Sequence, residues 1–261
     1  MAMEDQFLKI AKQAALEAGE IIKKYSGKTT QKNIKHEDIS DFATEADLEA
    51  EKKIVAILST AFPNHNILAE ENTRIDNKSE YTWVIDPLDG TFSFSVGIPY
   101  YSVSIGLLKD NKPFMGVIYN ISMNQLSWAE KDKGAYQNGE RIYVSGREKL
   151  EGSAVSLELG HRQKRSEKIN RYILPLILKI GYPYSFGSAV ATLGTLACGI
   201  LDAYIVEAWI WDLAAGAIII KEAGGKVTDL EGKEPDWSKE RLNVVVSNGL
   251  IHNEILEALK Q

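Results

Sequence analysis

The sequence predicts a layered protein of helices and sheets, with an N-terminal α+β lobe over residues 1–146 and a C-terminal α/β lobe over residues 147–261. Two observations predict this division. In the first half, two amphipathic helices precede strands joined by tight polar turns, which is typical of helices packed on an antiparallel sheet. In the second half, strands and helices alternate, which favours a parallel or mixed sheet covered by helices.

The elements of the first half follow from apolar spacing and from the residues that interrupt it. Two helices come first, separated by a polar loop, and the second is expected to begin near Thr44. An apolar strand is expected to end at Asp86 and Pro87, because proline cannot donate to a β-ladder. Asn138 and Gly139 are a two-residue hairpin signal. The expected helices span 4–25 and 44–62, and the expected strands span 67–71, 83–85, 101–108, 113–119 and 125–130.

The second half alternates regularly between apolar strand segments and helical segments. Ligand sites in such lobes lie beyond strand ends and near helix N-termini. Asp212 fits that position, because it starts a helix rich in small residues. The expected strands span 154–159, 182–186, 202–206 and 243–247, and the expected helices span 167–180, 188–199, 212–223 and 249–260.

Composition excludes several functional classes. The net charge of −6 argues against a nucleic-acid-binding face, and the basic cluster at 161–165 is short. No apolar run approaches the roughly 18 residues of a membrane span. The four histidines lack zinc-ligand spacing, and a single cysteine, Cys198, excludes an internal disulfide. The acidic N-terminus lacks the pattern of a secretory signal, so we expect a cytoplasmic protein.

The most informative stretch, residues 83–94, places two acids beside a tight turn that could bind a phosphate group. Asp86 follows the apolar strand, and Asp89 is followed by Gly90 and Thr91, whose amides can bind an anion. Two carboxylates would repel a phosphate unless cations stood between them, so the stretch indicates metal ions that bridge protein and phosphoryl oxygens. The alternative is an Asx-turn in which both acids cap local amides.

Each of the other acids can be interpreted either as a functional residue or as a structural one. Glu70 ends a strand and is either a ligand or one of a solvated pair with Glu71. Asp47 has capping-box spacing from Thr44, and Asp212 can be a helix N-cap. Taken together, Glu70, Asp86, Asp89 and Asp212 are four hard oxygen donors without histidine or cysteine, which selects Mg²⁺ or Mn²⁺.

Four segments, in this order along the chain, resemble the signatures of the inositol monophosphatase family of metal-dependent, lithium-sensitive sugar phosphatases. The resemblance implies the layered αβαβα sugar-phosphatase fold, a homodimer and a small phosphorylated polyol or sugar as substrate. The segments span nearly the whole chain, so the combined signal is specific. They are 41–47, 69–71, 83–91 and 211–225.

The resemblance also implies roles for individual residues. Asp47 and Thr91 resemble the pair that orients or deprotonates the attacking water, and Glu70 is the rival for that role. Two or three Mg²⁺ ions, or Mn²⁺, would be bound, with Asp86 bridging two of them. The implied metal ligands are Glu70, Asp86, the carbonyl of Leu88, Asp89 and Asp212.

Departures from the family pattern concern the sugar and leave the metal ligands intact. The segment from Glu207 to Asp212 looks about two residues shorter than in the animal enzymes, so Glu207 is out of step with the inositol-binding glutamate. Ser93 stands where asparagine is usual, and Ala69 replaces a common glycine. The expected substrate contacts are Gly90, Thr91, Gly187, Ser188, Ala189, Glu207 and Asp212.

Three hypotheses about function follow. The first is a Mg²⁺-dependent phosphomonoesterase that hydrolyses myo-inositol 1-phosphate by in-line attack of water. The second keeps this chemistry but takes fructose 1,6-bisphosphate or a 3′-phosphoadenosine nucleotide, because Glu207 is displaced. The third is a non-catalytic regulatory binding protein, which only the 161–165 cluster supports.

A haloacid-type phosphatase is a further rival enzyme, since it also uses aspartates and Mg²⁺. Its nucleophile motif needs two acids separated by one residue, whereas two residues separate Asp86 from Asp89. No aspartyl-phosphate intermediate is therefore expected.

Overall fold

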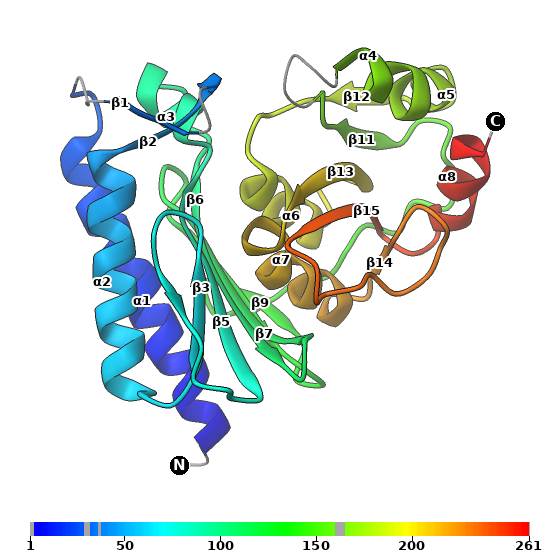
Figure 1. Cartoon of the computed structure of the whole chain (residues 1–261). Coiled ribbons are helices and arrows are strands. Elements are labelled where there is room, and N and C mark those ends of the chain that lie inside the picture. Colours follow the sequence, from blue (N-terminus) through cyan, green and yellow to red (C-terminus); the bar gives the residue numbers. More distant parts are fainter. Residues whose placement is uncertain (1–2, 29–31, 36–37, 160–164, 261) are drawn as a thin grey trace.

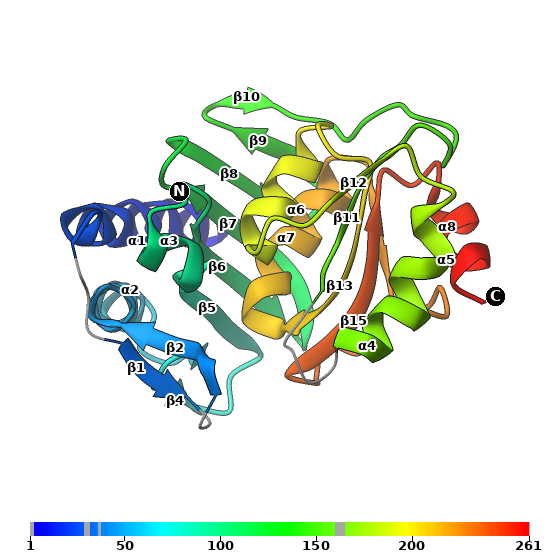
Figure 2. The same ribbon diagram turned by 90° about the horizontal axis from the view of Figure 1, so that it is seen from above.

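The computed structural model describes residues 3–28, 32–35, 38–159 and 165–260. These form five alternating layers of helices and sheets (Figure 1; Figure 2). The order is the helix pair α1 and α2, an eight-stranded sheet, the helix pair α6 and α7, a five-stranded sheet, and an outer layer of α4, α5 and α8. The αβαβα prediction is confirmed. Among the described helices, none has both the length and the apolar character that a membrane crossing requires.

The N-terminal layers match the predicted helices on an antiparallel sheet, apart from one parallel pair, β3 with β5. The sheet order is β10-β9-β8-β7-β6-β5-β3-β4. The helices α1 and α2 pack on one face of this sheet around buried aromatic side chains that include Phe7 and Trp83. The bounds are α1 Met3–Tyr25, α2 Glu45–Ala61, β3 Asn66–Ala69, β4 Arg74–Ile75, β5 Tyr81–Asp89, α3 Thr91–Val96, β6 Ser102–Lys109, β7 Lys112–Asn120, β8 Gln125–Glu130, β9 Ala135–Gln137 and β10 Glu140–Arg141.

The C-terminal sheet is mixed, as predicted, with the order β12-β11-β13-β15-β14. Its strand β11 pairs in parallel with β12 and β13, whereas β15 runs antiparallel to β13 and β14. The bounds are β11 Ala154–Leu157, α4 Arg165–Lys168, a π-helical turn Ile169–Ile173, α5 Leu174–Ile177, β12 Tyr182–Tyr184, α6 Ala189–Ala197, β13 Ala203–Trp209, α7 Ile210–Glu222, β14 Lys226–Thr228, β15 Arg241–Ser247 and α8 His252–Leu259.

The two halves share one apolar core. Helix α7 packs on the first sheet where Gly106 and Gly116 leave room for its backbone. A Cβ atom added at Gly116 would lie 2.4 Å from the carbonyl oxygen of Ala215. Each sheet contains strands from only one side of residues 146 and 147, but the proposed boundary between two domains stays a prediction.

Three local predictions were wrong. The strand at 83–85 does not end at Asp86, because β5 continues to Asp89 through an irregular section that accommodates Pro87. The polar loop after the first helix contains a two-stranded hairpin, β1 (Lys32–Lys35) and β2 (Asp38–Thr44). The helix carrying Asp212 begins earlier, at Ile210.

The hairpin at Asn138 and Gly139 is confirmed. Both residues have positive φ, and Gln137 pairs with Glu140. Such a two-residue turn matches the twist of antiparallel strands.

Candidate active site

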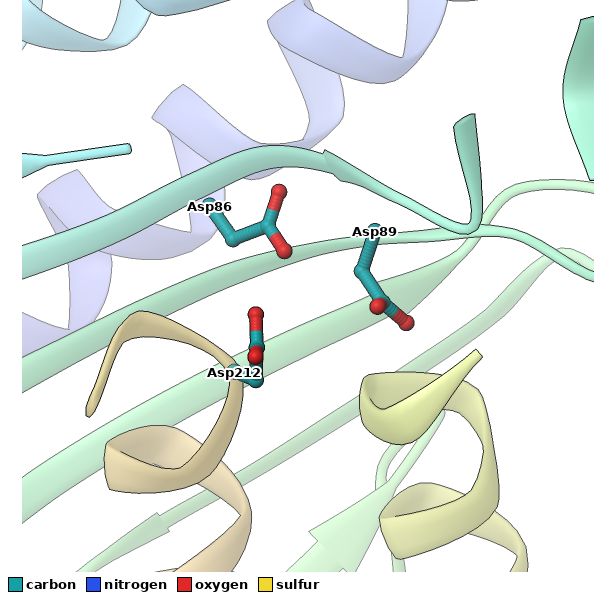
Figure 3. Close-up of side chains that lie close together, drawn as sticks. All are labelled: Asp86, Asp89 and Asp212. Carbon is teal, nitrogen blue, oxygen red and sulfur yellow. The ribbon is translucent and has the colours of Figure 1, made fainter. Parts of the chain in front are cut away.

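Three aspartates from the two halves meet between the sheets. Asp86 and Asp89 come from the end of β5, and Asp212 comes from the first turn of α7. One carboxylate oxygen of each lies within 4.8 Å of the others, and Figure 3 shows the Asp86 and Asp212 side chains directed toward each other with Asp89 beside them. The predicted meeting of Asp212 with Asp86 and Asp89 is therefore present.

The irregular end of β5 sets the spacing of the first two acids. Asp86 pairs with Ser104 and Asp89 pairs with Ser102, so β5 uses one residue more than β6 over this interval. This is a β-bulge, the setting in which a strand tolerates proline. The amide of Leu88 donates to Asp86 Oδ1 at 2.9 Å, so the Asx-turn alternative also describes part of the local structure.

The cluster is electrostatically strained without a cation. Burial raises the pKa of Asp86 well above 3.8, and the charges of Glu70, Asp89 and Asp212 raise it further. The pKa of Asp212 is also raised well above its usual value, first by burial and then by Asp89 and Glu70. Within the described part of the chain, no lysine or arginine forms an ion pair with the three aspartates.

The start of α6 holds Asp89. Oδ2 of Asp89 accepts hydrogen bonds from the Ser188 hydroxyl and from the Val190 amide, the latter at 2.9 Å. Burial nevertheless raises the pKa of Asp89 to about 6, against the lowering effect of these donors. The loop of Gly187, Ser188 and Ala189, predicted to contact sugar, thus lies directly beside a predicted metal ligand.

Gly90 connects β5 to α3 and is the N-cap of that short helix, with φ of 86°. A Cβ atom there would lie 2.8 Å from the carbonyl oxygen of Tyr100, so only glycine fits without movement of the backbone. Thr91 follows as the first helical residue. The predicted anion-binding turn is therefore tightly constrained.

Asp47 and Thr91 are in contact. The Thr91 hydroxyl lies 3.0 Å from Asp47 Oδ1 and 3.0 Å from the carbonyl oxygen of Leu88, and its one proton can serve one of them at a time. Asp47 also accepts from the Thr44 amide at 2.8 Å, so the capping interaction and the link to the site are both present. Burial raises the pKa of Asp47 to about 6.

Glu70 follows β3 at the same end of the sheet, and its amide donates to the Ile85 carbonyl at 3.0 Å. Its carboxylate lies outside the 4.8 Å group of aspartates. Its charge still contributes to the raised pKa values of Asp86, Asp89 and Asp212. The structure therefore brings Glu70 near the cluster.

Comparison with known proteins agrees with this arrangement. Residues 3–261 match the model of the inositol monophosphatase family. The chain belongs to this family. Among relatives, it is 36% identical over 263 residues to an inositol monophosphatase of Mesembryanthemum crystallinum, covering 98% of this chain and 96% of that protein. Family membership places the chain among the phosphoric monoester hydrolases.

Two further similarities extend the comparison. The chain is 34% identical over 258 residues to the fructose-1,6-bisphosphatase/inositol-1-monophosphatase of Aquifex aeolicus, covering 98% of this chain and 96% of that protein. The solved structure of the extragenic suppressor protein suhB from Bartonella henselae superposes with a TM-score of 0.92 at 32% identity, covering 98% of this chain and 99% of that one. The layered fold is thus that of known family members.

Glu207 was predicted to contact the substrate, but the structure does not place it at the aspartate cluster. It lies on β13 and faces the outer layer, where its carboxylate contacts Arg241 Nε at 2.9 Å and Lys168 Nζ at 3.4 Å. That Glu207 is out of step with the inositol-binding glutamate of relatives stays a prediction. The basic cluster at 161–165 lies outside the described residues except for Arg165.

Glu51 is a supporting residue that was not predicted from the sequence. This buried acid of α2 accepts hydrogen bonds from the amides of Glu71, Asn72 and Thr73, at 2.8 to 3.0 Å, and from the Thr73 hydroxyl. It therefore fixes the turn that follows Glu70. The available signal was an acid within the apolar stripe of an amphipathic helix.

Asp212 is the third residue of α7 and not its N-cap. Its Oδ2 accepts from the amide of Trp209 at 2.8 Å, which fixes the carboxylate at the start of the helix. The helix begins two residues earlier than expected because Ile210 and Trp211 are buried in the shared core.

Proposed function

We propose that this protein is a Mg²⁺-dependent phosphomonoesterase that hydrolyses inositol monophosphate, with myo-inositol 1-phosphate as first substrate. The observation that supports this most is the group of three aspartates with raised or strongly raised pKa values and no cationic partner in the described residues. Burying such acids together is costly unless a bound cation compensates them.

The donor set fits a hard divalent cation. All donors are oxygens, and no histidine or cysteine belongs to the group, which favours Mg²⁺ or Mn²⁺ over zinc. When bound, Mg²⁺ supplies acidity to a water molecule and neutralises charge on the leaving oxygen. The residues that would hold the ions are Glu70, Asp86, the carbonyl of Leu88, Asp89 and Asp212.

Asp47 and Thr91 would orient the attacking water. The Thr91 hydroxyl can donate to Asp47 or to Leu88, so it can accept a proton from water while passing its own to the buried carboxylate. A pKa of about 6 leaves Asp47 mostly ionised at neutral pH and able to take that proton. Glu70 is the rival base, and its charge contributes to the raised pKa of Asp47.

The phosphate would lie against the turn at Gly90 and Thr91. Their amides can donate to its non-bridging oxygens, and the absence of a Cβ atom at Gly90 keeps the backbone close to Tyr100. The start of α6 at Ser188 and Ala189 would border the leaving group, because it already contacts Asp89.

Fructose 1,6-bisphosphate is a second candidate substrate. The position of Glu207 favours it, because this carboxylate is engaged by two cations and is directed away from the aspartates. The relative from Aquifex aeolicus carries both activities in its name. Among the residues that the structure describes, which leave out 161–164, no contact favours the 3′-phosphoadenosine alternative or the non-catalytic regulator.

Phosphate release from inositol 1-phosphate tests the proposal. We expect turnover with Mg²⁺, inhibition by Li⁺ and loss of turnover in Asp89→Asn. Turnover that persists in excess chelator would contradict it. Sedimentation of the purified protein tests the homodimer that the family resemblance implies, and cell fractionation tests the cytoplasmic location.

A further inference from the structure

The connection that leads from β12 into α6 is anchored by one aromatic side chain. This connection ends at Ser188, whose hydroxyl donates to Asp89. Phe186 is half-buried, whereas the other residues of 182–187 are exposed. A Cβ atom added at Gly187 would lie 3.8 Å from the nearest described atom outside its chain neighbours, so the backbone there is not tightly enclosed. The position of Ser188 therefore depends on how firmly Phe186 is packed.

Phe186 packs on the N-terminal half of the chain through Tyr100. The centres of the two rings lie 5.0 Å apart, and the angle between the ring planes is 29°, which is a stacked arrangement. Tyr100 belongs to the loop between α3 and β6, so the stack joins the two halves. The ring of Tyr184 stacks on Phe186 at 5.3 Å, but this tyrosine is 42% exposed. Aromatic pairs at such separations stabilise a contact beyond the area that they bury.

Tyr100 makes a second contact with α6. Its hydroxyl lies 3.2 Å from Oγ1 of Thr195. The Thr195 hydroxyl already donates to the Ala191 carbonyl at 2.8 Å, so the Tyr100 hydroxyl is the donor in this pair. The ring of Tyr100 thus holds the entry to α6, and its hydroxyl holds the second turn of that helix.

The backbone of Tyr100 adjoins the turn that is proposed to bind phosphate. A Cβ atom added at Gly90 would lie 2.8 Å from the Tyr100 carbonyl oxygen and 3.2 Å from Cβ of Ser188. Tyr100 and Ser188 therefore both border Gly90. The same tyrosine contacts this turn through its backbone and the start of α6 through its side chain.

We propose that Tyr100 and Phe186 are positioning residues for the metal-binding site. Their stacked rings hold Ser188 where its hydroxyl reaches Asp89, and neither ring has to contact a cation or the substrate. Hydrogen-bond donors to a metal ligand orient it, and their loss weakens metal binding. The stack therefore increases the affinity of the site for divalent cations. This inference rests on the proposed function, because it requires Asp89 to be a cation ligand.

Direct titration of chelator-treated protein with Mn²⁺ tests the role of the stack without any measurement of turnover. In Phe186→Ala, we expect the Kd for Mn²⁺ to rise about threefold to tenfold, because loss of the stacked contact releases Ser188. Phe186→Tyr keeps a ring that can stack and should stay near wild type. Phe186→Leu keeps the apolar volume without the ring and gives the same comparison if the alanine variant does not fold.

Tyr136→Ala is the matched control. Tyr136 also stacks on another ring, that of Trp128 at 5.9 Å, but it lies on β9, which three strands separate from β5. This variant should bind Mn²⁺ as wild type does. Melting temperatures in chelator show that each variant is folded.

A double variant separates positioning from a general loss of stability. If Phe186 acts through Ser188, then Phe186→Ala should weaken Mn²⁺ binding clearly less when Ser188→Ala is already present. An unchanged Kd in Phe186→Ala, or equal weakening with and without Ser188→Ala, would overturn the role of the stack and leave the phosphatase function standing. Wild type that binds no Mn²⁺ would instead contradict both the proposed function and this inference.

Discussion

Buried carboxylates occur in two kinds of surroundings in this molecule. Asp202 accepts hydrogen bonds from the Ser145 hydroxyl, the Arg147 guanidinium and the Ala154 amide, and Glu51 accepts four from the turn after Glu70. Asp86 is equally buried, at 1% exposure, but receives one amide and faces other acids.

The hydrogen-bond partners of a buried acid indicate its role. A carboxylate whose lone pairs are filled by protein donors holds the fold together. One that faces other carboxylates, such as Asp86, leaves a deficit of positive charge that the described residues do not fill. Removal of the two kinds of acid should therefore change the stability of the metal-free protein in opposite directions.

The largest effect is expected from Asp86→Asn. Loss of the central carboxylate should lower kcat/KM by about 10³-fold, because cation-assisted charge stabilisation contributes several kcal/mol. In chelator, the variant should melt at a higher temperature than wild type, since one repelling charge is gone. Phosphate release and thermal melting with and without Mg²⁺ measure both effects.

Asp110→Asn serves as a control for this variant, because Asp110 lies in the exposed turn between β6 and β7. It should change neither activity nor the Mg²⁺-dependent rise in melting temperature. A lower melting temperature of Asp86→Asn in chelator would show that the cluster is not strained.

Glu51→Ala should have the opposite effect on stability. It leaves three amides and a hydroxyl without their acceptor, and we expect a loss of about 3 kcal/mol in the free energy of unfolding. Activity should fall as well, because the freed turn adjoins Glu70. Chemical denaturation measures the change, and a variant as stable as wild type would remove the distinction between the two kinds of acid.

His252 is a buried base whose ring nitrogens both have partners. Its two ring nitrogens contact Ser247 and Thr228 at 2.8 and 2.9 Å, and burial lowers its pKa from 6.5 to about 4. The unfolded chain therefore binds the proton more readily, and stability is lost as pH falls from 6.5 toward 4. Between pH 7 and pH 5, the loss should be about 2 kcal/mol.

Denaturation of wild type and His252→Gln over this pH range checks the expectation. The variant should lack this part of the pH dependence, whatever its stability at pH 7. Equal slopes for the two proteins would assign the acid sensitivity to other groups.

The smallest effect is expected from Ser188→Ala. The Ser188 hydroxyl donates to Asp89, and loss of such a partner of a metal ligand typically weakens metal binding about tenfold. The Mg²⁺ concentration for half-maximal activity should rise accordingly, while Ser188→Thr, which keeps the hydroxyl, should stay near wild type. An unchanged Mg²⁺ requirement in the alanine variant would show that Val190 and Ala189 alone position Asp89.

The sequence predicted the layers and the candidate acids because both depend on strong local signals. Apolar periodicity located the main helices and strands, and Asp86, Asp89 and Asp212 stand out beside turn and helix-start residues. That these three aspartates meet was predicted by the family resemblance, because no local rule brings distant residues together.

The structural details that were predicted wrongly or not at all depend on contacts between distant segments. The bulge that carries Pro87 is fixed by pairing with β6, and the earlier start of α7 is fixed by burial of Ile210 and Trp211 against the first sheet. The role of Glu51 depends on a turn about 20 residues away, which helical spacing does not show. The orientation of Glu207 depends on Arg241, a partner on another strand.

Titration of chelator-treated protein with Mn²⁺ tests whether aspartates from both halves share divalent cations. We predict saturable binding to wild type that is lost or greatly weakened in Asp86→Asn and in Asp212→Asn alike, with both variants folded. Binding of equal strength in wild type and both variants, or no binding to wild type, would contradict the account.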